Sequence, residues 1–303
     1  MTVIRKKVFV ASDLSEGAEE AIRQGDAWAR SMQADLVVCH VMPDPLRFNV
    51  LFPQLHEQMA LDLPALREEA VEELSAETAE ITGRSEEEFA VIVDAGHPAA
   101  VIVERAEHYD ADLIVVGSHG HSGGNGPGLG SVATQVLRHA HCPVLVARPY
   151  RPTGVVLCAT DFSDPALPAV NAAVFEAKRR SARLVLLHVI DAEHVAQYEA
   201  LRRSQGAQGG LTAALKESLR EAVMEKLKEA LRDACAEGET VVREGTPAGE
   251  IVDAADELHA ELVVVGAVGQ SGLRRLRLGS VAEAVAYSSP VPVLAVREYE
   301  DEA

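Results

Sequence analysis

The sequence predicts an α/β protein made of two tandem doubly wound five-stranded parallel sheets. Three observations lead to this fold class: the chain repeats itself, short apolar runs alternate with helical segments in each repeat, and the runs lack a polar face. Strands without a polar face are typical of parallel sheets that helices cover on both sides. The crossovers that join such strands are usually helices.

The repeat is clearest in two pairs of segments. VFVASDLSEGAEEAI at Val8 returns as VLCATDFSDPALPAV at Val156, and ADLIVVGSHG at Ala111 returns as AELVVVGAVG at Ala260. The stretch RPYRPTG between the copies has the prolines and glycine of a short connector. We therefore expect one domain over residues 1–148, a linker over 149–154 and a second domain over 155–303.

In the first copy, strands and helices are expected to alternate along the chain. The strands are the runs of Val, Ile and Leu at 8–11, 36–41, 89–93, 113–116 and 144–147, and the helices are the periodic segments at 16–30, 64–82, 98–109 and 131–140. In the second copy, Asp164-Pro165 and Thr246-Pro247 each indicate an N-cap followed by the first helical residue.

Composition excludes several classes of protein. The net charge of −19 is too acidic for a non-specific nucleic-acid binder, and 48% hydrophobic residues exclude disorder as the main state. No apolar run approaches the roughly 18 residues that span a bilayer, so we expect a soluble cytoplasmic protein without a membrane partner. The four cysteines are far apart and form no C-x-x-C pair, which favours reduced thiols.

Two positions in each copy indicate a ligand site, because ligands of such sheets bind beyond the carboxyl ends of the strands, where the strand order reverses. The first is an acid after the first strand, Asp13 or Asp161, with a serine two residues later. The second is a loop after the fourth strand with the pattern G-x2-G-x9-G-S, at residues 117–131 and 266–280.

The glycine loop has the chemistry of a polyphosphate site. Spaced glycines let backbone N–H groups approach an anion, and the helix after Gly-Ser adds the N–H groups of its first turn. Ser131 and Ser280 add hydroxyl donors. The alternatives are a surface turn with an ordinary Ser N-cap and, for Asp13 and Asp161, simple caps of the first helix.

The two loops differ in charge. The second contains Arg274, Arg275 and Arg277, which form either an anion clamp or a solvated charged face. The first loop has no Lys or Arg, so the negative charge of a phosphate bound there would be neutralised by backbone dipoles, a metal ion, or His119 and His121.

These motifs resemble those of the universal stress protein family, and the resemblance covers nearly the whole chain. It rests on V-A-S-D-L-S and C-A-T-D-F-S at the first strands, H-V at the ends of the second strands, G-x-P-A after the third and the glycine loop after the fourth. It implies a fold similar to that of the adenine nucleotide alpha hydrolases, in which each sheet has the strand order 3-2-1-4-5. The strand order then reverses between strands one and four.

Nucleotide-binding members of the family hold ATP with the strand-one Asp and the strand-two Val at adenine and the loop at the phosphates. The resemblance gives these roles to Asp13, Val41, Gly117, Gly120, Gly130, Ser131, Asp161, Val189, Gly266, Gly269, Gly279 and Ser280. From the possible anion clamp we add Arg277 to the predicted nucleotide-binding residues. The first copy departs from the family at Gly123–Gly128, which replaces a basic stretch and costs more entropy to order. We therefore expect the second copy to bind ATP and the first copy to bind it more weakly or not at all.

No catalytic motif is present: the chain lacks a Walker sequence, a G-x-S-x-G elbow and H-E-x-x-H. The pairs His119/His121 and His139/His141 should lie about 15 Å apart, at opposite ends of a helix, so we expect no shared metal site. We expect His40 and His188, at the ends of the second strands, to be structural.

Binding is therefore the main prediction: an ATP-binding module for stress response or signalling, with at most weak ATPase activity. The alternatives are a slow Mg-dependent ATP hydrolase or phosphotransferase, and one copy serving as a packing partner for the other.

The implied fifth strands, near Pro143 and Pro292, are apolar edges, so we expect the two copies to pack through them. Whether the protein also forms a homodimer stays open. The long connections at residues 43–63 and 191–210 either cover the nucleotide or bind another ligand, and the sequence does not decide between these roles.

Overall fold

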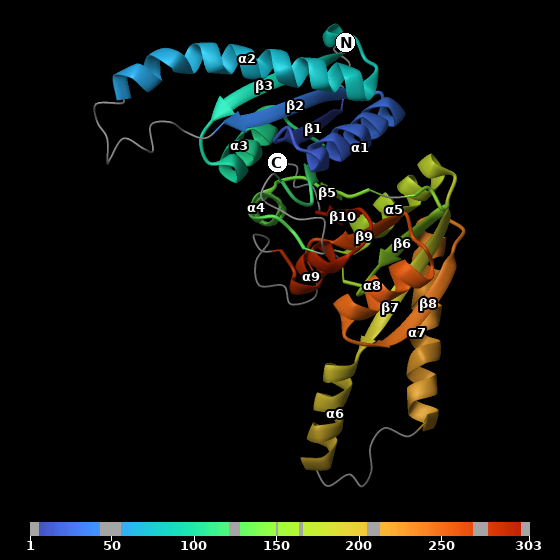
Figure 1. The fold of residues 1–303 in the computed structure, drawn as a ribbon. Coiled ribbons are helices and arrows are strands. Elements are labelled where there is room, and N and C mark those ends of the chain that lie inside the picture. The colour runs from blue at the N-terminus through green and yellow to red at the C-terminus, as the bar shows by residue number, and fades with distance from the viewer. Residues whose placement is uncertain are drawn as a thin grey trace, which may run out of the picture. The chain divides into compact units, whose positions relative to one another are not determined.

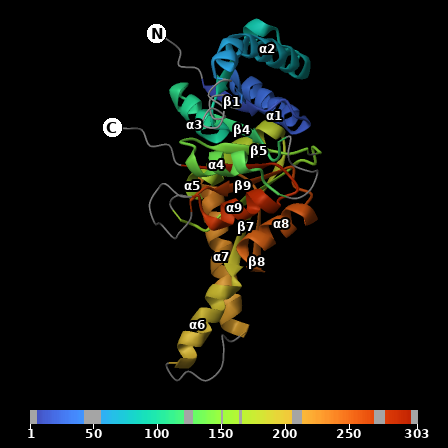
Figure 2. The same ribbon diagram turned by 60° about the vertical axis from the view of Figure 1, so that its left-hand side comes forward.

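The computed structural model describes residues 6–42, 56–120, 128–149, 151–163, 166–204, 213–268 and 278–297. The chain divides into two compact units, Met1–Pro149 and Tyr150–Ala303, and the division lies within the linker expected at 149–154. Figures 1 and 2 show the elements of both units in two views. Each unit contains one copy of the sequence repeat.

The first unit is a five-stranded parallel sheet between two pairs of helices. Parallel pairing gives the order β3-β2-β1-β4-β5. The helices α1 and α2 contact each other on one side of the sheet, and α3 and α4 contact each other on the other side (Figure 1). The elements are β1 Lys7–Ser12, α1 Glu16–Met32, β2 Asp35–Met42, α2 His56–Thr82, the 3-10 turn η3 Glu86–Glu88, β3 Phe89–Ala95, α3 Pro98–His108, β4 Leu113–Gly117, α4 Ser131–His139 and β5 Val144–Ala147.

The second unit repeats this arrangement, with the strand order β8-β7-β6-β9-β10. Its elements are β6 Val155–Ala159, α5 Leu167–Arg180, β7 Arg183–Asp191, α6 Ala192–Ser204, α7 Ala213–Asp233, β8 Glu239–Gly245, α8 Pro247–Glu257, β9 Leu262–Gly266, α9 Ser280–Ser288 and β10 Val293–Val296. One difference is the pair α6 and α7, which extends beyond the sheet of this unit (Figure 1). The predicted fold class, two tandem α/β domains with parallel sheets, is confirmed.

The central strands form the core because both of their faces are covered. Phe9 of β1 and Leu157 of β6 are fully buried, as are their neighbours Ile114 on β4 and Leu186 on β7. Burial of each such side chain contributes about 1.5–3 kcal/mol, which explains why the strands read as continuous apolar runs.

Two predicted helix starts differ from the structure. The helix α2 begins at His56, and Pro64, predicted as its first residue, lies inside it. Proline is best tolerated in the first turn of a helix, so Pro64 suggested that the helix begins there, whereas α2 begins eight residues earlier. The helix α5 begins at Leu167, with Ala166 as N-cap; Asp164 and Pro165 lie outside the described residues. The predicted N-cap and first residue of α8, Thr246 and Pro247, are confirmed.

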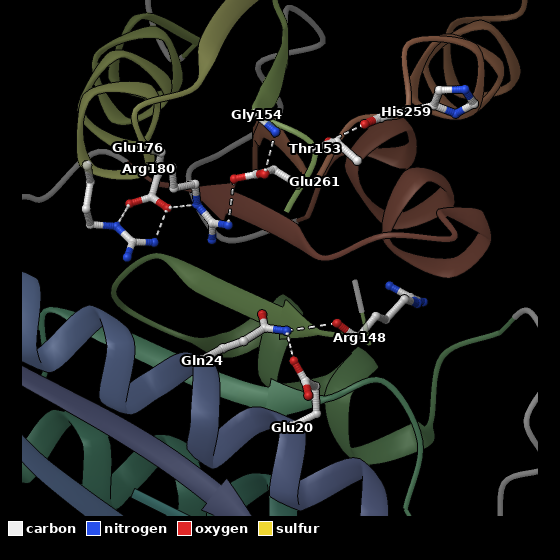
Figure 3. Close-up of polar contacts among 10 residues, drawn as sticks. Glu20, Gln24, Arg148, Thr153, Gly154, Glu176, Arg180, His259 and Glu261 are labelled. Atoms are coloured by element: carbon white, nitrogen blue, oxygen red, sulfur yellow. Dashed lines mark hydrogen bonds and ion pairs between the residues drawn. The ribbon is translucent and has the colours of Figure 1, made fainter. Parts of the chain in front are cut away.

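The chain is anchored where it leaves the first unit. The Gln24 side chain of α1 donates from Nε2 to the Arg148 carbonyl oxygen at 2.8 Å and to Glu20 Oε1 at 2.7 Å (Figure 3). Gln24 is buried, so these bonds hold the end of β5 against α1.

A second set of bonds anchors the chain where the second unit begins. Thr153 Oγ1 donates to the His259 carbonyl oxygen, and the Gly154 N–H donates to Glu261 Oε2 at 2.9 Å (Figure 3). Glu261 Oε1 also accepts from Arg180 Nη1 at 3.2 Å, and Arg180 Nε donates to Glu176 Oε2 at 2.9 Å. These carboxylates are buried, so charged hydrogen bonds fix the start of β6.

Within the described part of the chain, none of the helices is both long enough and apolar enough to cross a membrane.

Candidate functional site

A tight turn follows the first strand of the first unit. Leu14 has a φ of 61°, in the left-handed region, and its N–H donates to Ser12 Oγ at 3.1 Å. Asp13 Oδ1 accepts from the Ser15 N–H at 3.3 Å and from the Ser15 hydroxyl. A left-handed leucine costs about 1–2 kcal/mol, so these side-chain bonds hold the backbone in a strained turn.

The second unit contains the same turn. Phe162 has a φ of 60°, and its N–H donates to Thr160 Oγ1 at 3.1 Å. Asp161 Oδ1 accepts from the Ser163 N–H at 3.0 Å and from its hydroxyl at 2.6 Å. Both acids therefore have the same geometry in their turns.

The alternative that these acids simply cap the first helix is wrong. The N-cap of α1 is Ser15, whose side chain accepts from the Ala18 N–H at 3.4 Å. Asp13 instead holds the capping serine. In the second unit the N-cap of α5 is Ala166, so Asp161 does not cap that helix either.

Histidines at the ends of the second strands support the turns. His40 Nδ1 lies 2.9 Å from the Ser12 carbonyl oxygen, and His188 Nδ1 lies 2.8 Å from the Thr160 carbonyl oxygen. The His188 ring also stacks on Phe162, with 4.6 Å between ring centroids. Burial lowers the pKa of His188, although the Thr160 carbonyl and Asp161 oppose the shift. Both histidines thus have the structural role that we predicted.

The two ends of each glycine loop meet. The Gly130 N–H donates to the Ser118 carbonyl oxygen at 2.7 Å, and the Gly279 N–H donates to the Ala267 carbonyl oxygen at 2.7 Å. These glycines are the N-caps of α4 and α9, and Ser131 and Ser280 are the first helical residues. The alternative of an ordinary Ser N-cap is therefore wrong. Each helix begins directly beside the end of the fourth strand of its unit.

In the first unit the acid turn and the glycine loop lie against each other. A Cβ on Gly120 would lie 2.2 Å from Asp13 Oδ2, and a Cβ on Gly117 would lie 2.9 Å from the Gly17 carbonyl oxygen at the start of α1. Glycine is therefore required for this approach of backbone and carboxylate. Asp13 thus lies against Gly120, and Gly130, which precedes Ser131, lies against Ser118 and His119 of the same loop.

The valines of the second strands flank these sites. Ser12 pairs with His40 in the parallel ladder, so Val41 follows one residue beyond this pair, level with Asp13. Val189 follows His188 in the same way, and only 8% of its surface is exposed. Both lie at the carboxyl ends of the strands, as the sequence predicts.

Part of each site lies outside the described residues. In the second unit this holds for Gly269 and for the proposed clamp of Arg274, Arg275 and Arg277, and in the first for His121 and residues 123–127. Gly266, at the end of β9, and Gly279 and Ser280, at the start of α9, are described. For the second unit, the structure thus gives the two ends of the loop and the acid turn.

Sequence reasoning missed a cation at the first loop. Arg148, directly after β5, donates from Nη2 to the Gly128 carbonyl oxygen at 2.9 Å. Burial lowers its pKa to about 10, so it remains charged at neutral pH. The signal was present as CPVLVAR and VPVLAVR, which place Arg148 and Arg297 at equivalent positions.

The described residues contain no other obvious reactive centre. They include no group of three or more His, Cys, Asp or Glu side chains that could hold a metal ion. Cys39 and Cys158 are buried, and burial raises the pKa of each thiol to about 12. Such thiols stay protonated and are poor nucleophiles.

Comparison with known proteins identifies the family. The sequence profile of the Universal stress protein family matches residues 5–148 and 153–297. Universal stress protein Rv2623 of Mycobacterium tuberculosis is 31% identical over 306 residues, which cover 96% of each chain. Universal stress protein Sll1388 of Synechocystis is 30% identical over 149 residues, which cover 47% of this chain and 97% of that relative.

Solved structures show the same fold over both units. The crystal structure of a universal stress protein from Archaeoglobus fulgidus has a TM-score of 0.64 and 21% sequence identity, and the match covers 98% of this chain and 97% of that chain. The profile matches each copy of the repeat separately, and the relative from Mycobacterium tuberculosis aligns over both. The chain therefore belongs to the universal stress protein family, as a member with two tandem domains.

Proposed function

We propose that the protein binds ATP at the glycine loop and acid turn of each unit, more tightly in the second, and acts as a stress-response or signalling module. The observation that carries this proposal is the close approach of Asp13 Oδ2 to Gly120. It brings the acid and the loop, which are far apart in the sequence, to one place at the strand ends.

The residues of the site fit the parts of a nucleotide. A carboxylate oxygen of Asp13 or Asp161 can accept from an exocyclic amine or a ribose hydroxyl, while Val41 or Val189 supplies an apolar wall. The first N–H groups of α4 and α9 lack partners within their helices, and they favour the negative phosphates. When bound, ATP supplies the negative charge that these helix ends and the nearby arginines are suited to hold.

The ranking of the two units rests on charge. Arg148 and Arg297 occupy equivalent positions, so they favour neither unit. The loop of the second unit adds Arg274, Arg275 and Arg277, whereas that of the first has no Lys or Arg. Charged hydrogen bonds contribute about 1.5–3 kcal/mol each, so one good contact to phosphate gives a difference of at least about tenfold in Kd.

The test is calorimetric titration of ATP into the full chain and into two matched variants. Gly279→Val should remove the tighter of two binding phases, and Gly130→Val the weaker, because a branched side chain at either N-cap fills the space beside the loop. Circular dichroism and Tm verify that each variant is folded. Loss of the tighter phase in Gly130→Val would overturn the ranking, and no saturable binding to the unmodified chain would overturn the function.

Hydrolysis is tested with the same proteins. A binding module releases ADP no faster than spontaneous hydrolysis, or only slightly faster. Sustained release far above that rate, abolished by Gly279→Val, would favour the Mg-dependent hydrolase instead.

A further inference from the structure

The second unit contains a cavity that the proposed nucleotide site does not use. It has a volume of about 380 Å³ and lies between the end of β7 and the helices α6 and α7. Pockets for small molecules have volumes of roughly 300–1,000 Å³ and mostly apolar walls. Of the nine described residues that line this cavity, six are Ile, Val, Leu or Tyr, and the polar ones are His188, Asp191 and His194.

The apolar walls remain partly open to water. Leu215, Leu219 and Val223 follow one another at intervals of four residues, so they lie on one face of α7. Leu215 is 45% exposed and Leu219 41%, and Tyr198 on the facing part of α6 is 52% exposed. Both helices extend beyond the sheet of the second unit (Figure 1), and residues of both line the cavity. A ligand with an apolar body would remove this surface from water.

The cavity is separate from the nucleotide site. Successive residues of a strand point to opposite faces, and His188 and Ile190 line the cavity whereas Val189 between them does not. The His188 ring, which lines the cavity, stacks on Phe162 of the turn at Asp161, so the cavity lies beside this turn but is lined by other residues.

The polar residues lie at the end of β7 and the start of α6. Asp191 Oδ1 accepts from the Glu193 N–H at 2.8 Å, and Oδ2 lies 3.6 Å from Nδ1 of His194, whose side chain is 78% exposed. Because burial lowers the pKa of His188, this imidazole is neutral at pH 7 and does not repel a cation. Asp191 is therefore the carboxylate among the described residues at the polar end of the cavity.

Two lysines of α7 lie near the cavity but do not line it. Lys216 Nζ is 3.5 Å from Glu244 Oε1, so a carboxylate offsets its charge. Lys226 Nζ lies 5.6 Å from the centroid of the Phe162 ring, on which His188 stacks. Neither lysine supplies an anion site within the lining of the cavity.

We infer that this cavity binds an amphipathic amine, with its apolar body between α6 and α7 and its ammonium group at Asp191. The carboxylate at the polar end and the net charge of −19 both favour a cation over an anion. The inference does not depend on the proposed ATP sites, because none of the described residues that line the cavity is assigned to them.

The experiment titrates three probes of equal length, n-octylamine, n-octanol and n-octanoate, into the full chain at pH 7, below their aggregation limits. Saturable binding is expected, tightest for the amine and weakest for the carboxylate. Leu219→Gln should weaken binding of the amine about tenfold, because it removes apolar contact. Leu201→Gln is the matched control: Leu201 is 55% exposed on α6 but does not line the cavity, so binding should not change.

A second variant tests the ammonium contact. Asp191→Asn should reduce the advantage of the amine over the alcohol by about threefold to tenfold, and it should leave α6 intact because Asn caps a helix as well as Asp does. The inference is overturned if the three probes bind equally, if Leu201→Gln and Leu219→Gln have the same effect, or if saturating ATP displaces the amine. Failure of ATP to bind leaves these outcomes unchanged, so the two proposals fail separately.

Discussion

At the scale of single residues, Arg148 has the most direct link to the proposed function. Its guanidinium donates to the Gly128 carbonyl oxygen at the end of the first glycine loop, and its own carbonyl oxygen accepts from Gln24. One residue therefore connects the loop, β5 and α1. It places a cation at the end of a loop that itself contains no Lys or Arg.

We predict that Arg148→Met weakens the lower-affinity ATP phase by about tenfold and leaves the tighter phase unchanged, since a charged hydrogen bond contributes about 1.5–3 kcal/mol. Calorimetric titration of the full chain measures both phases. Arg297→Met is the matched variant and should affect the tighter phase instead. Equal effects of both variants on both phases would contradict the assignment.

His188 predicts how stability depends on pH. Burial lowers its pKa from 6.5, so the unfolded chain binds a proton more readily than the folded chain does. Its contribution to stability is therefore fully present above about pH 6.5 and decreases as the pH falls toward the pKa of the folded state.

We expect the difference in unfolding free energy between the unmodified chain and His188→Gln to become smaller from pH 7.5 to pH 5. Urea denaturation at several pH values measures it, and other titrating groups cancel in the difference. A difference that grows as the pH falls would show that the pKa is raised instead.

At the scale of elements, the start of β6 depends on a buried carboxylate. Glu261 is only 3% exposed, and it accepts from the Gly154 N–H and from Arg180. Replacing Glu261 by a neutral residue takes one carboxylate from Arg180, which keeps Glu176 as its second partner, and weakens two buried hydrogen bonds.

We predict that Glu261→Gln lowers the free energy of unfolding by about 1–3 kcal/mol, as measured by urea denaturation. The control is Glu239→Gln, which breaks the exposed ion pair between Glu239 and Arg183 and should cost less than about 1 kcal/mol. Similar losses in both variants would mean that the Glu261 network adds little stability.

The same scale shows what the sequence could predict. Every strand of the first copy was found, because buried parallel strands are continuous apolar runs between helical segments. The start of α2 was missed because a proline inside a helix looks like a helix start. The meeting of Asp13 with Gly120 could be anticipated from the strand order of the family. The contact of Arg148 with Gly128 could not, because Gly128 corresponds to Arg277 in the second copy and belongs to no shared motif.

At the scale of the whole molecule, the pairing of the two copies through their fifth strands stays a prediction. In a parallel edge strand, alternate N–H groups point away from the sheet, and they are protected from exchange only if another strand accepts them. We expect slow hydrogen exchange at all amides of Val144–Ala147. Fast exchange of alternate amides there, with slow exchange in β4, would show an open edge.

The anchored connector has a consequence for association. Gln24 holds the chain at Arg148, and Thr153 and Gly154 are held in the second unit, so only residues 149–152 separate the fixed points. A short tether of this kind raises the effective concentration of one domain near the other to about the millimolar range. A tandem chain can therefore rely on a domain interface too weak to hold two free subunits together.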